Sequence, residues 1–331
     1  MSVYSCTVCK FRYDEWLGDT KNGVPPGVPF FKLAGSVCTT CGMQGEGRHV
    51  VVPETKYAGL EATYYDQFAG KAGIVFYRDW LLQEPAPVSV LELGVGTGRI
   101  ATELAEHGMS VCGVDWSCEM LEIAERKKKR VRKENRERLE LVEQDMWELD
   151  LHREFTHVLM PEGIFQQAAD RMEQRKLLRI ITQHLTTAGV VAIDLVLPPM
   201  RESWRVEQKK FVFPDRMVYQ RIEGETSFVR QKFRCTVTYE TFLDQYEQPR
   251  YRVDREYALL LPNELELLLE SEGFQVIEAF ENFGKTTYDT GEKDYDRDRW
   301  QHGGYPFVRS TEAHASGTRW TAIAKKISGI V

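Results

Sequence analysis

The fold of this chain is decided by the stretch Leu91-Glu92-Leu93-Gly94-Val95-Gly96-Thr97-Gly98-Arg99. A short apolar run, residues 88–93, leads into it and predicts a buried strand, and residues 100–105 after it carry one apolar helical face. Glycines at a strand-to-helix junction let the backbone curve beneath a ligand, and the N–H groups of the first helical turn face that ligand. A dinucleotide site needs a third glycine where Arg99 stands, so the spacing argues against NAD and favours a different adenosine ligand.

The chain on both sides of this stretch alternates between predicted strands and helices, which indicates a parallel sheet. Asp115 ends the next strand, at the distance from the glycines where an acid can accept hydrogen bonds from both ribose hydroxyls. Residues 204–257 change to a period of two and are rich in Val, Phe, Tyr and Thr, which predicts an antiparallel insertion. Further helices are expected over 57–82, from about 118, over 170–185 and over 262–271, and further strands over 110–114, 139–142, 157–160, 190–195, 275–280 and 318–324.

Two CxxC pairs near the N-terminus predict a metal site. They are Cys6 with Cys9 and Cys38 with Cys41, and 28 residues separate the pairs. Each CxxC turn points two sulfurs at a common centre, so the four thiolates can surround one metal tetrahedrally. The crowded pairs suit metal binding in a reducing compartment better than a disulfide framework. Their spacing fits zinc or a single iron.

Residues 1 to about 47 also resemble rubredoxin. The resemblance rests on Tyr4-Ser5-Cys6-Thr7-Val8-Cys9, Tyr13-Asp14, Gly18-Asp19, residues 22–27, Phe30 and Cys38-Thr39-Thr40-Cys41-Gly42. It implies one iron held by the four cysteines, with an aromatic core of Tyr4, Tyr13 and Phe30. Ser36 and Thr39 stand where that family usually has tryptophan and proline, which favours a structural or docking role over a redox role. Zinc would serve such a role as well as iron.

The stretch 90–124 resembles the first two motifs of class I S-adenosylmethionine-dependent methyltransferases, and Glu143-Gln144-Asp145-Met146-Trp147 resembles the third. The resemblance implies that Asp145 bonds the adenine amino group of S-adenosylmethionine and that Met146 lies against the ring. It also implies a set of residues that bind the rest of this cofactor: Glu92, Gly94, Gly96, Gly98, Asp115, Trp116 and Met120.

The segment before the glycines resembles the glycine N-methyltransferase-like branch of this family. In that branch two tyrosines with the spacing of Tyr65 and Tyr77 line the cofactor and the substrate. Arg78, beside Tyr77, would neutralise the methionine carboxylate, and Arg99 competes for that role. We therefore expect all four residues at the cofactor.

The loop that begins Met160-Pro161-Glu162-Gly163 follows the predicted fourth strand, at the edge of the sheet where ligands bind in this fold. We expect Met160 on the cofactor side and Glu162 as a carboxylate that holds a cationic amine. Tyr65 and Glu162 are the candidate catalytic residues. Methyl transfer from a sulfonium is an in-line displacement, so alignment supplies most of the acceleration and a strong base is optional.

Together these patterns predict an α/β protein with two units. Residues 1–47 form a small rubredoxin-like domain organised by one Fe or Zn ion. Residues 48–331 form a Rossmann-like class I methyltransferase domain, with a seven-stranded, mostly parallel sheet and the antiparallel insertion at about 204–257. The insertion and the loop 284–317 would build the pocket for the methyl acceptor.

The expected function is methyl transfer from S-adenosylmethionine to nitrogen of a small molecule. Amines and the imidazole of an amino-acid-like metabolite, such as a thiohistidine, are the candidate acceptors. Two alternatives stay open: an RNA base methyltransferase with a four-cysteine zinc module, and a rubredoxin-type electron-transfer or docking protein.

Composition argues against a nucleic acid or membrane partner. The net charge is −7, from 43 basic and 50 acidic residues among 331, so there is no global attraction to RNA or to anionic lipid. The basic run 126–136 contains glutamate and is more typical of a solvated helix face. No apolar run approaches the roughly 18 residues of a spanning helix, and the N-terminus lacks the regions of a signal peptide. We expect a cytoplasmic protein, and nothing in the sequence indicates its oligomeric state.

Overall fold

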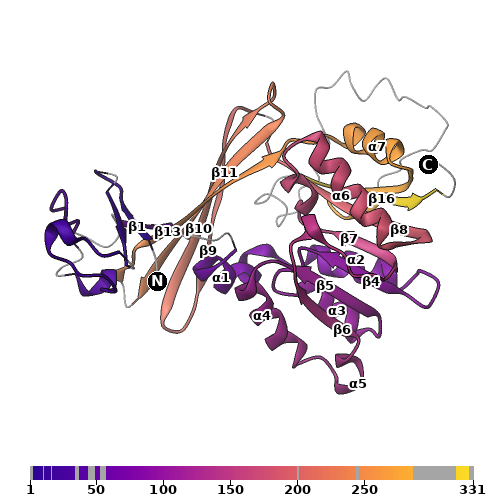
Figure 1. Ribbon diagram of the computed structural model, residues 1–331, viewed down its shortest axis with the longest axis horizontal. Helices are drawn as coiled ribbons and strands as arrows, with labels where there is room; N and C mark the ends of the chain where they lie inside the picture. Colours follow the sequence, from indigo (N-terminus) through magenta and orange to yellow (C-terminus); the bar gives the residue numbers. More distant parts are fainter. Residues whose placement is uncertain are drawn as a thin grey trace.

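The computed structural model describes residues 3–9, 11–15, 17–33, 37–43, 49–52, 57–199, 201–243, 246–285 and 318–327. Figure 1 shows three parts along the longest axis: a small N-terminal unit, an elongated antiparallel sheet, and a sheet flanked by helices. Among the described residues, no helix combines the length and the apolar character needed to span a bilayer.

The helix-flanked part is built on a mixed sheet with the order β15-β14-β16-β8-β7-β4-β5-β6. The pairs among the last five strands in this order are parallel, whereas β16 runs antiparallel to β8 and β14. The strands are β4 (Ser89–Leu93), β5 (Ser110–Asp115), β6 (Leu139–Glu143), β7 (Phe155–Met160), β8 (Leu185–Leu197), β14 (Phe274–Glu281), β15 (Gly284–Lys285) and β16 (Thr318–Lys326). The two-residue β15 only closes a hairpin on β14, so the expected seven-stranded class I methyltransferase sheet is confirmed.

The helices of this part are α1 (Gly59–Ala69), α2 (Ala72–Leu81), α3 (Arg99–Glu106), α4 (Cys118–Lys128), α5 (Lys133–Arg136), α6 (Arg171–Gln183) and α7 (Pro262–Ser271). Local chemistry sets their ends: the side chain of Ser117 accepts a hydrogen bond from the N–H of Met120 at the start of α4, and Asp170 caps α6 in the same way. The helical pattern predicted as continuous over 57–82 is two helices, because the chain turns at Gly70, whose φ is 77°.

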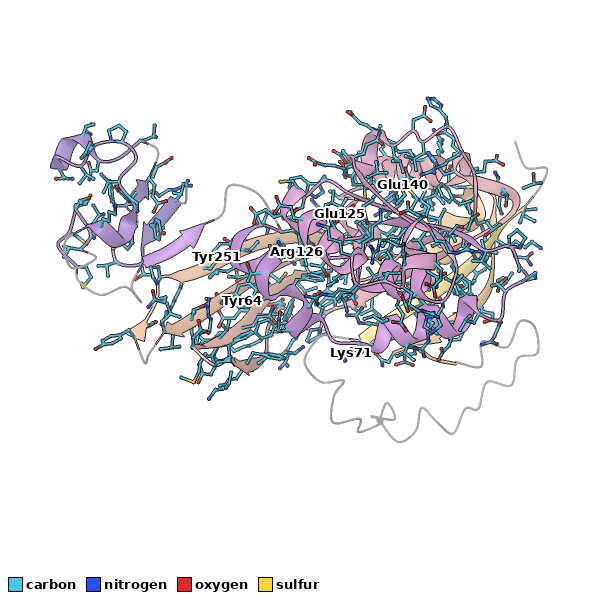
Figure 2. The ribbon with its side chains drawn as sticks, turned by 90° about the horizontal axis from the view of Figure 1, so that it is seen from below. Tyr64, Lys71, Glu125, Arg126, Glu140 and Tyr251 are labelled. Atoms are coloured by element: carbon cyan, nitrogen blue, oxygen red, sulfur yellow. The ribbon has the colours of Figure 1, made fainter. Side chains whose placement is uncertain are left out.

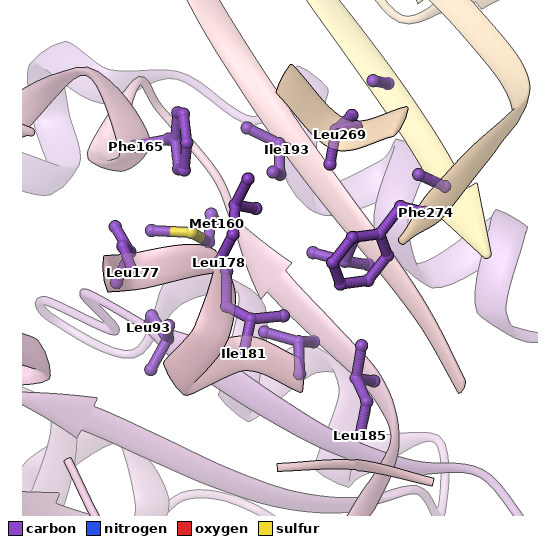
Figure 3. Close-up of a cluster of buried hydrophobic side chains, with 14 of the residues drawn as sticks. Leu93, Met160, Phe165, Leu177, Leu178, Ile181, Leu185, Ile193, Leu269 and Phe274 are labelled. Atoms are coloured by element: carbon purple, nitrogen blue, oxygen red, sulfur yellow. The ribbon is translucent and has the colours of Figure 1, made fainter. Parts of the chain in front are cut away.

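Two apolar clusters hold the sheet between its helices. On one side, Leu178 and Ile181 of α6 pack with Ile193 of β8 and Phe274 of β14 (Figure 3). The other cluster joins α2, α3 and α4 to β4 and β5. Each fully buried leucine or phenylalanine contributes about 1.5–3 kcal/mol, so the sheet edge that carries the glycine loop rests on a rigid base.

The predicted antiparallel insertion is confirmed as β9 (Ser203–Val212), β10 (Arg216–Ser227), β11 (Lys232–Leu243), β12 (Tyr246–Glu247) and β13 (Arg250–Ala258). Alternate residues of β11 are buried, which is the period of two read from the sequence. The long strands β10 and β11 lie between the N-terminal unit and the helix-flanked sheet in Figure 1.

The N-terminal unit contributes β1 (Val3–Cys6), β2 (Arg12–Asp14) and β3 (His49–Val52) to the same sheet as the insertion, in the order β2-β1-β3-β13-β11-β10-β9. The connection is parallel pairing of β3 with β13, in which Val50 faces Arg250 and Val51 faces Tyr251. This shared sheet was not predicted from the sequence. The expected boundary after residue 47 lies outside the described residues, so the division into 1–47 and 48–331 remains a prediction.

An apolar cluster fills the space where the insertion meets α1. Its buried members are Tyr64, Phe68, Val218, Val237, Tyr239, Tyr251 and Val253, and Tyr4 of the N-terminal unit packs against it. Tyr4 in turn stacks on Phe30 with ring centroids 4.2 Å apart. Figure 2 labels Tyr64 and Tyr251, and the hydroxyl of Tyr251 donates a 2.6 Å hydrogen bond to the carbonyl of Ala58.

Candidate active site and metal centre

The glycine loop at the end of β4 forms one wall of a cavity of about 750 Å³. Gly94, Gly96 and Gly98 have φ of 68°, 53° and 71°, a region that favours glycine. A Cβ on Gly94 would lie 2.4 Å from the side chain of Ile164, so a larger residue cannot fit there. A Cβ on Gly96 would meet only a carbonyl oxygen at 3.9 Å, so this backbone lies bare against the cavity. The predicted cofactor or catalytic residues that line it are Tyr65, Glu92, Gly94, Gly96, Arg99, Asp115, Trp116, Met120, Met146 and Glu162.

Two carboxyl groups face this cavity from the ends of β4 and β5. The N–H groups of Gly96 and Ser117 donate to Asp115 at 2.8 and 2.9 Å and fix its orientation, while burial raises its pKa. Glu92 is 2% exposed, and burial raises its pKa to about 8. Among the described residues, Glu92 Oε2 has no hydrogen-bond partner. A buried acceptor in this state fits the ammonium group of S-adenosylmethionine, and Asp115 is held ready for its ribose hydroxyls.

Glu162 lies at the centre of an ionic cluster. Its carboxylate accepts from Arg99 at 3.2 Å and also pairs with Arg319 of β16. Arg99 lies over the ring of Tyr65, 5.5 Å from its centroid, and burial together with the charge of Glu162 raises the pKa of Tyr65 to about 12. The sequence suggested that Glu162 would hold a cationic amine, but two guanidinium groups already neutralise this carboxylate. The sequence analysis did not identify Arg319 as a site residue. An arginine at the start of a buried strand is unusual and would have marked it as a candidate.

Five residues predicted at the cofactor do not line the cavity: Tyr77, Arg78, Gly98, Asp145 and Met160. Arg78 pairs with Asp79 and Glu103 on the surface, which leaves Arg99 as the arginine at the site. The side chain of Asp145 accepts from the N–H of Trp147 at 3.0 Å, and its neighbours Gln144 and Met146 line the cavity instead. Gly98 starts α3, and Met160 is fully buried in the core beneath the site.

Tyr77 also lies beneath the site rather than in it. It is fully buried, and its hydroxyl donates to Asp194 of β8 at 2.7 Å. Asp194 accepts as well from the hydroxyl of Thr321 at 2.7 Å and from the N–H of Glu162 at 3.1 Å. Because Glu162 has a φ of 59°, this network holds the loop in a conformation that costs energy. Tyr77 therefore supports the loop and does not touch a ligand in the cavity.

A second cavity, of about 1190 Å³, adjoins the first and shares Tyr57, Tyr65 and Glu162 with it. Its walls come from α1, the loop after β7 and the strands of the insertion, as the sequence predicted for an acceptor pocket. Most of the loop 284–317, which was expected to contribute, lies outside the described residues. Within the described walls the pocket is lined by apolar and aromatic side chains: Phe68, Val196, Trp204, Ile222, Phe233, Val237 and Tyr239.

Charged side chains also enter the second cavity, and sequence reasoning missed them. Arg255 pairs with Glu61, which is 1% exposed, and its guanidinium lies 4.2 Å from the ring centroid of Tyr57. Lys209 reaches the wall from β9. The sequence does contain an indication for Glu61, because this acid stands between the apolar residues Leu60 and Ala62 in a predicted helix.

The four predicted metal ligands come together in the N-terminal unit. The Sγ atoms of Cys6, Cys9, Cys38 and Cys41 all lie within 4.8 Å of one another. Cys6 and Cys41 are 3.8 Å apart, and Cys9 and Cys38 are 3.5 Å apart. A tetrahedral ion with metal–sulfur bonds of about 2.3 Å has sulfur–sulfur edges of about 3.8 Å, so the cluster fits one Zn or Fe ion. Tyr13 and Phe30 are buried beside it, as predicted for the aromatic core.

Comparisons with known proteins agree with both sites. Residues 3–48 match the rubredoxin family, and residues 90–189 match a methyltransferase domain family. The chain is 34% identical over 133 residues to the cypemycin N-terminal methyltransferase of a Streptomyces species, covering 39% of this chain and 52% of that protein. It is 38% identical over 72 residues to the putative methyltransferase YqeM of Bacillus subtilis, covering 22% and 29%. The chain thus spans about half, or less, of the length of these curated relatives.

Solved structures show the same fold at low identity. The CcbJ methyltransferase from Streptomyces caelestis has a TM-score of 0.59 and 18% identity, with 81% of this chain and 96% of that chain covered. The sugar N-methyltransferase KedS8 from Streptoalloteichus has a TM-score of 0.56 and 19% identity, with 80% and 92% covered. Residues 3–48 therefore match a rubredoxin domain, and residues 90–189 match a methyltransferase domain that lies within a class I methyltransferase fold.

Proposed function

We propose that this protein transfers a methyl group from S-adenosylmethionine to a nitrogen atom of a small molecule. The observation that carries the proposal is the meeting of two cavities at Tyr65 and Glu162. One cavity has the glycine loop and acids that suit the cofactor, and the other has the apolar and aromatic walls of a metabolite site. A relative named as an N-terminal methyltransferase supports the choice of nitrogen.

Different residues around the first cavity would hold different parts of the cofactor. When bound, S-adenosylmethionine supplies a methyl group activated by its sulfonium. Glu92 would accept hydrogen bonds from the ammonium of the cofactor, and Asp115 from its ribose hydroxyls. Arg99 would hold the cofactor carboxylate, exchanging part of its contact with Glu162. Met146 and Trp116 would lie against the adenine ring.

The chemistry of the second cavity supports nitrogen as the attacking atom. An alcohol needs a base to remove its proton, whereas a neutral amine or imidazole attacks with its own lone pair. Both lining carboxylates, Glu61 and Glu162, are ion-paired with arginine, and no histidine is among the described lining residues. Tyr65, with a pKa of about 12, stays protonated. The site therefore works by aligning the acceptor and excluding water rather than by strong base catalysis.

The basic run 126–136 gives RNA binding no support. Lys127 pairs with Asp66, and Arg132 pairs with Glu106, so part of its charge is already neutralised within the domain. The site therefore favours a small molecule over RNA as the methyl acceptor.

Two measurements on the full chain test the proposal. Calorimetry should detect micromolar S-adenosylmethionine binding that falls at least about tenfold in Asp115→Ala, while Glu134→Ala, an exposed acid at α5, binds like the wild type. Release of S-adenosylhomocysteine is then measured with amines and with alcohols of the same shape. Turnover should occur with amines only and should rise with pH as the amine becomes neutral. Lack of cofactor binding by folded wild-type protein, or turnover with the alcohols alone, would overturn it.

A further inference from the structure

The charges inside the second cavity do not cancel. Its lining holds three cations, Lys209, Arg255 and Arg319, and two carboxylates. Arg255 is paired with Glu61, and Arg319 is paired with Glu162. Lys209 forms no ion pair among the described residues, and the contact of its Nζ is the carbonyl oxygen of Phe68 at 3.0 Å. One positive charge is therefore left over.

The surroundings make this leftover charge costly. Lys209 is half-buried in a wall that includes Phe68 and Tyr239, and burial followed by repulsion from Arg319 lowers its pKa. A cation taken out of water without a partner destabilises the protein until an anion joins it. A ligand whose negatively charged group reaches Lys209 would remove this cost, and the saving would add to its free energy of binding.

We propose that the methyl acceptor carries a carboxylate which binds Lys209, joined through an apolar or aromatic body to the nitrogen that is methylated. The inference rests on the proposed function, and it narrows the acceptor from any small amine to an amino acid or related amino carboxylate. The body of the acceptor would lie against Phe233 and Trp204, and its nitrogen would face Tyr65 at the wall shared with the cofactor cavity.

The same charges exclude another class of acceptor. A permanently cationic ligand would be repelled by Lys209, and both carboxylates of the lining are already held by arginine side chains. The cavity therefore selects for the anionic end of an amino carboxylate, and its amine end must arrive neutral to react.

The chain offers a matched pair of lysines for the test. Lys209 enters the cavity, whereas its neighbour Lys210 is exposed and lies over the ring of Tyr219, 5.5 Å from the centroid. Both are replaced by glutamine in the full chain. Binding of 4-(aminomethyl)benzoate and of benzylamine is measured by calorimetry on protein saturated with S-adenosylhomocysteine, and cofactor binding and thermal melting are measured on each variant.

The carboxylate should make 4-(aminomethyl)benzoate bind about tenfold more tightly than benzylamine, the size of one charge-assisted hydrogen bond. Lys209→Gln should reduce this preference to less than about twofold without changing cofactor affinity, and Lys210→Gln should keep it. Equal binding of the two probes, or a preference that survives Lys209→Gln or is lost equally in both variants, overturns the inference. Failure of the proposed function is distinguishable, because it appears as absent cofactor binding, and the two probes are then compared on cofactor-free protein.

Discussion

Replacing Glu92 by glutamine should stabilise the cofactor-free protein at neutral pH. The ordinary pKa of a glutamate is 4.5, and burial raises that of Glu92 to about 8. When folding raises the pKa of an acid, the folded protein binds the proton more tightly than the unfolded chain does. The stabilisation from this proton is complete below the unfolded-state pKa and is lost as the pH rises toward the folded-state pKa. Between the unfolded pKa of 4.5 and pH 7 the free energy of unfolding falls by about 1.4 kcal/mol for each pH unit, which sets an upper bound of about 3–4 kcal/mol on the loss.

The same carboxyl group should release a proton when the cofactor binds. At pH 7 a group with a pKa of about 8 is about nine-tenths protonated, and pairing with the cofactor ammonium ionises it. The ammonium, with an ordinary pKa of about 7.8, takes up about one-tenth of a proton, so the net release is about 0.8 proton. In Glu92→Gln this release disappears, and affinity falls at least about tenfold because an ionic contact is lost.

Both effects are measurable on one set of proteins. Thermal melting from pH 5 to pH 8 should show the wild type losing stability relative to Glu92→Gln, with a difference of several degrees at pH 7 and little at pH 5. Calorimetry in phosphate and in Tris gives the proton count from the difference in binding heat. Glu125→Gln, at the exposed position on α4 that is labelled in Figure 2, is the control and should behave like the wild type. A proton release unchanged in Glu92→Gln, or parallel melting profiles, would refute this reasoning.

Three further outcomes follow from contacts elsewhere in the structure. Glu61→Gln leaves Arg255 in a buried wall without its carboxylate, so melting should show a loss of about 3–5 kcal/mol, and an unchanged melting temperature would count against the pair. Gly224→Ala places a Cβ 2.2 Å from the indole of Trp204, which must move; acceptor affinity should fall while cofactor affinity, measured by calorimetry, stays within about twofold. Removal of the metal with a chelator should lower the first melting transition and leave cofactor affinity within about twofold, because none of the described residues before Tyr57 lines the first cavity; a parallel loss of cofactor binding would contradict this separation.

The parts of the site that the sequence predicted are those carried by contiguous residues. The glycine loop and Asp115 follow from one strand, one turn and the next strand, so their positions are set by local geometry. The metal ligands follow for the same reason, since two CxxC turns need only to approach each other. In each case a short stretch of chain brings its own functional atoms together.

The missed residues are those whose partners lie far along the chain. Arg319 reaches Glu162 only because β16 inserts beside β8, and nothing near either residue indicates that pairing. The sequence left Arg78 and Arg99 as alternatives for a related reason: the face that each helix turns to the cavity depends on packing against its neighbour, and in the structure Arg78 pairs with Glu103. Lys209 is one of two adjacent lysines, and only the tertiary fold of the insertion distinguishes them.

The parallel pairing of β3 with β13 also constrains the order in which the chain can fold during synthesis. Val50 pairs with Arg250, a partner 200 residues later, so this pairing forms only after the insertion has been synthesised. The four cysteines, by contrast, lie between residues 6 and 41, and their four sulfur atoms come together within the N-terminal unit. N-terminal units generally fold first on the ribosome. We therefore expect the four-cysteine site to form before this strand pairing, with one edge of β3 unpaired until the insertion has been synthesised.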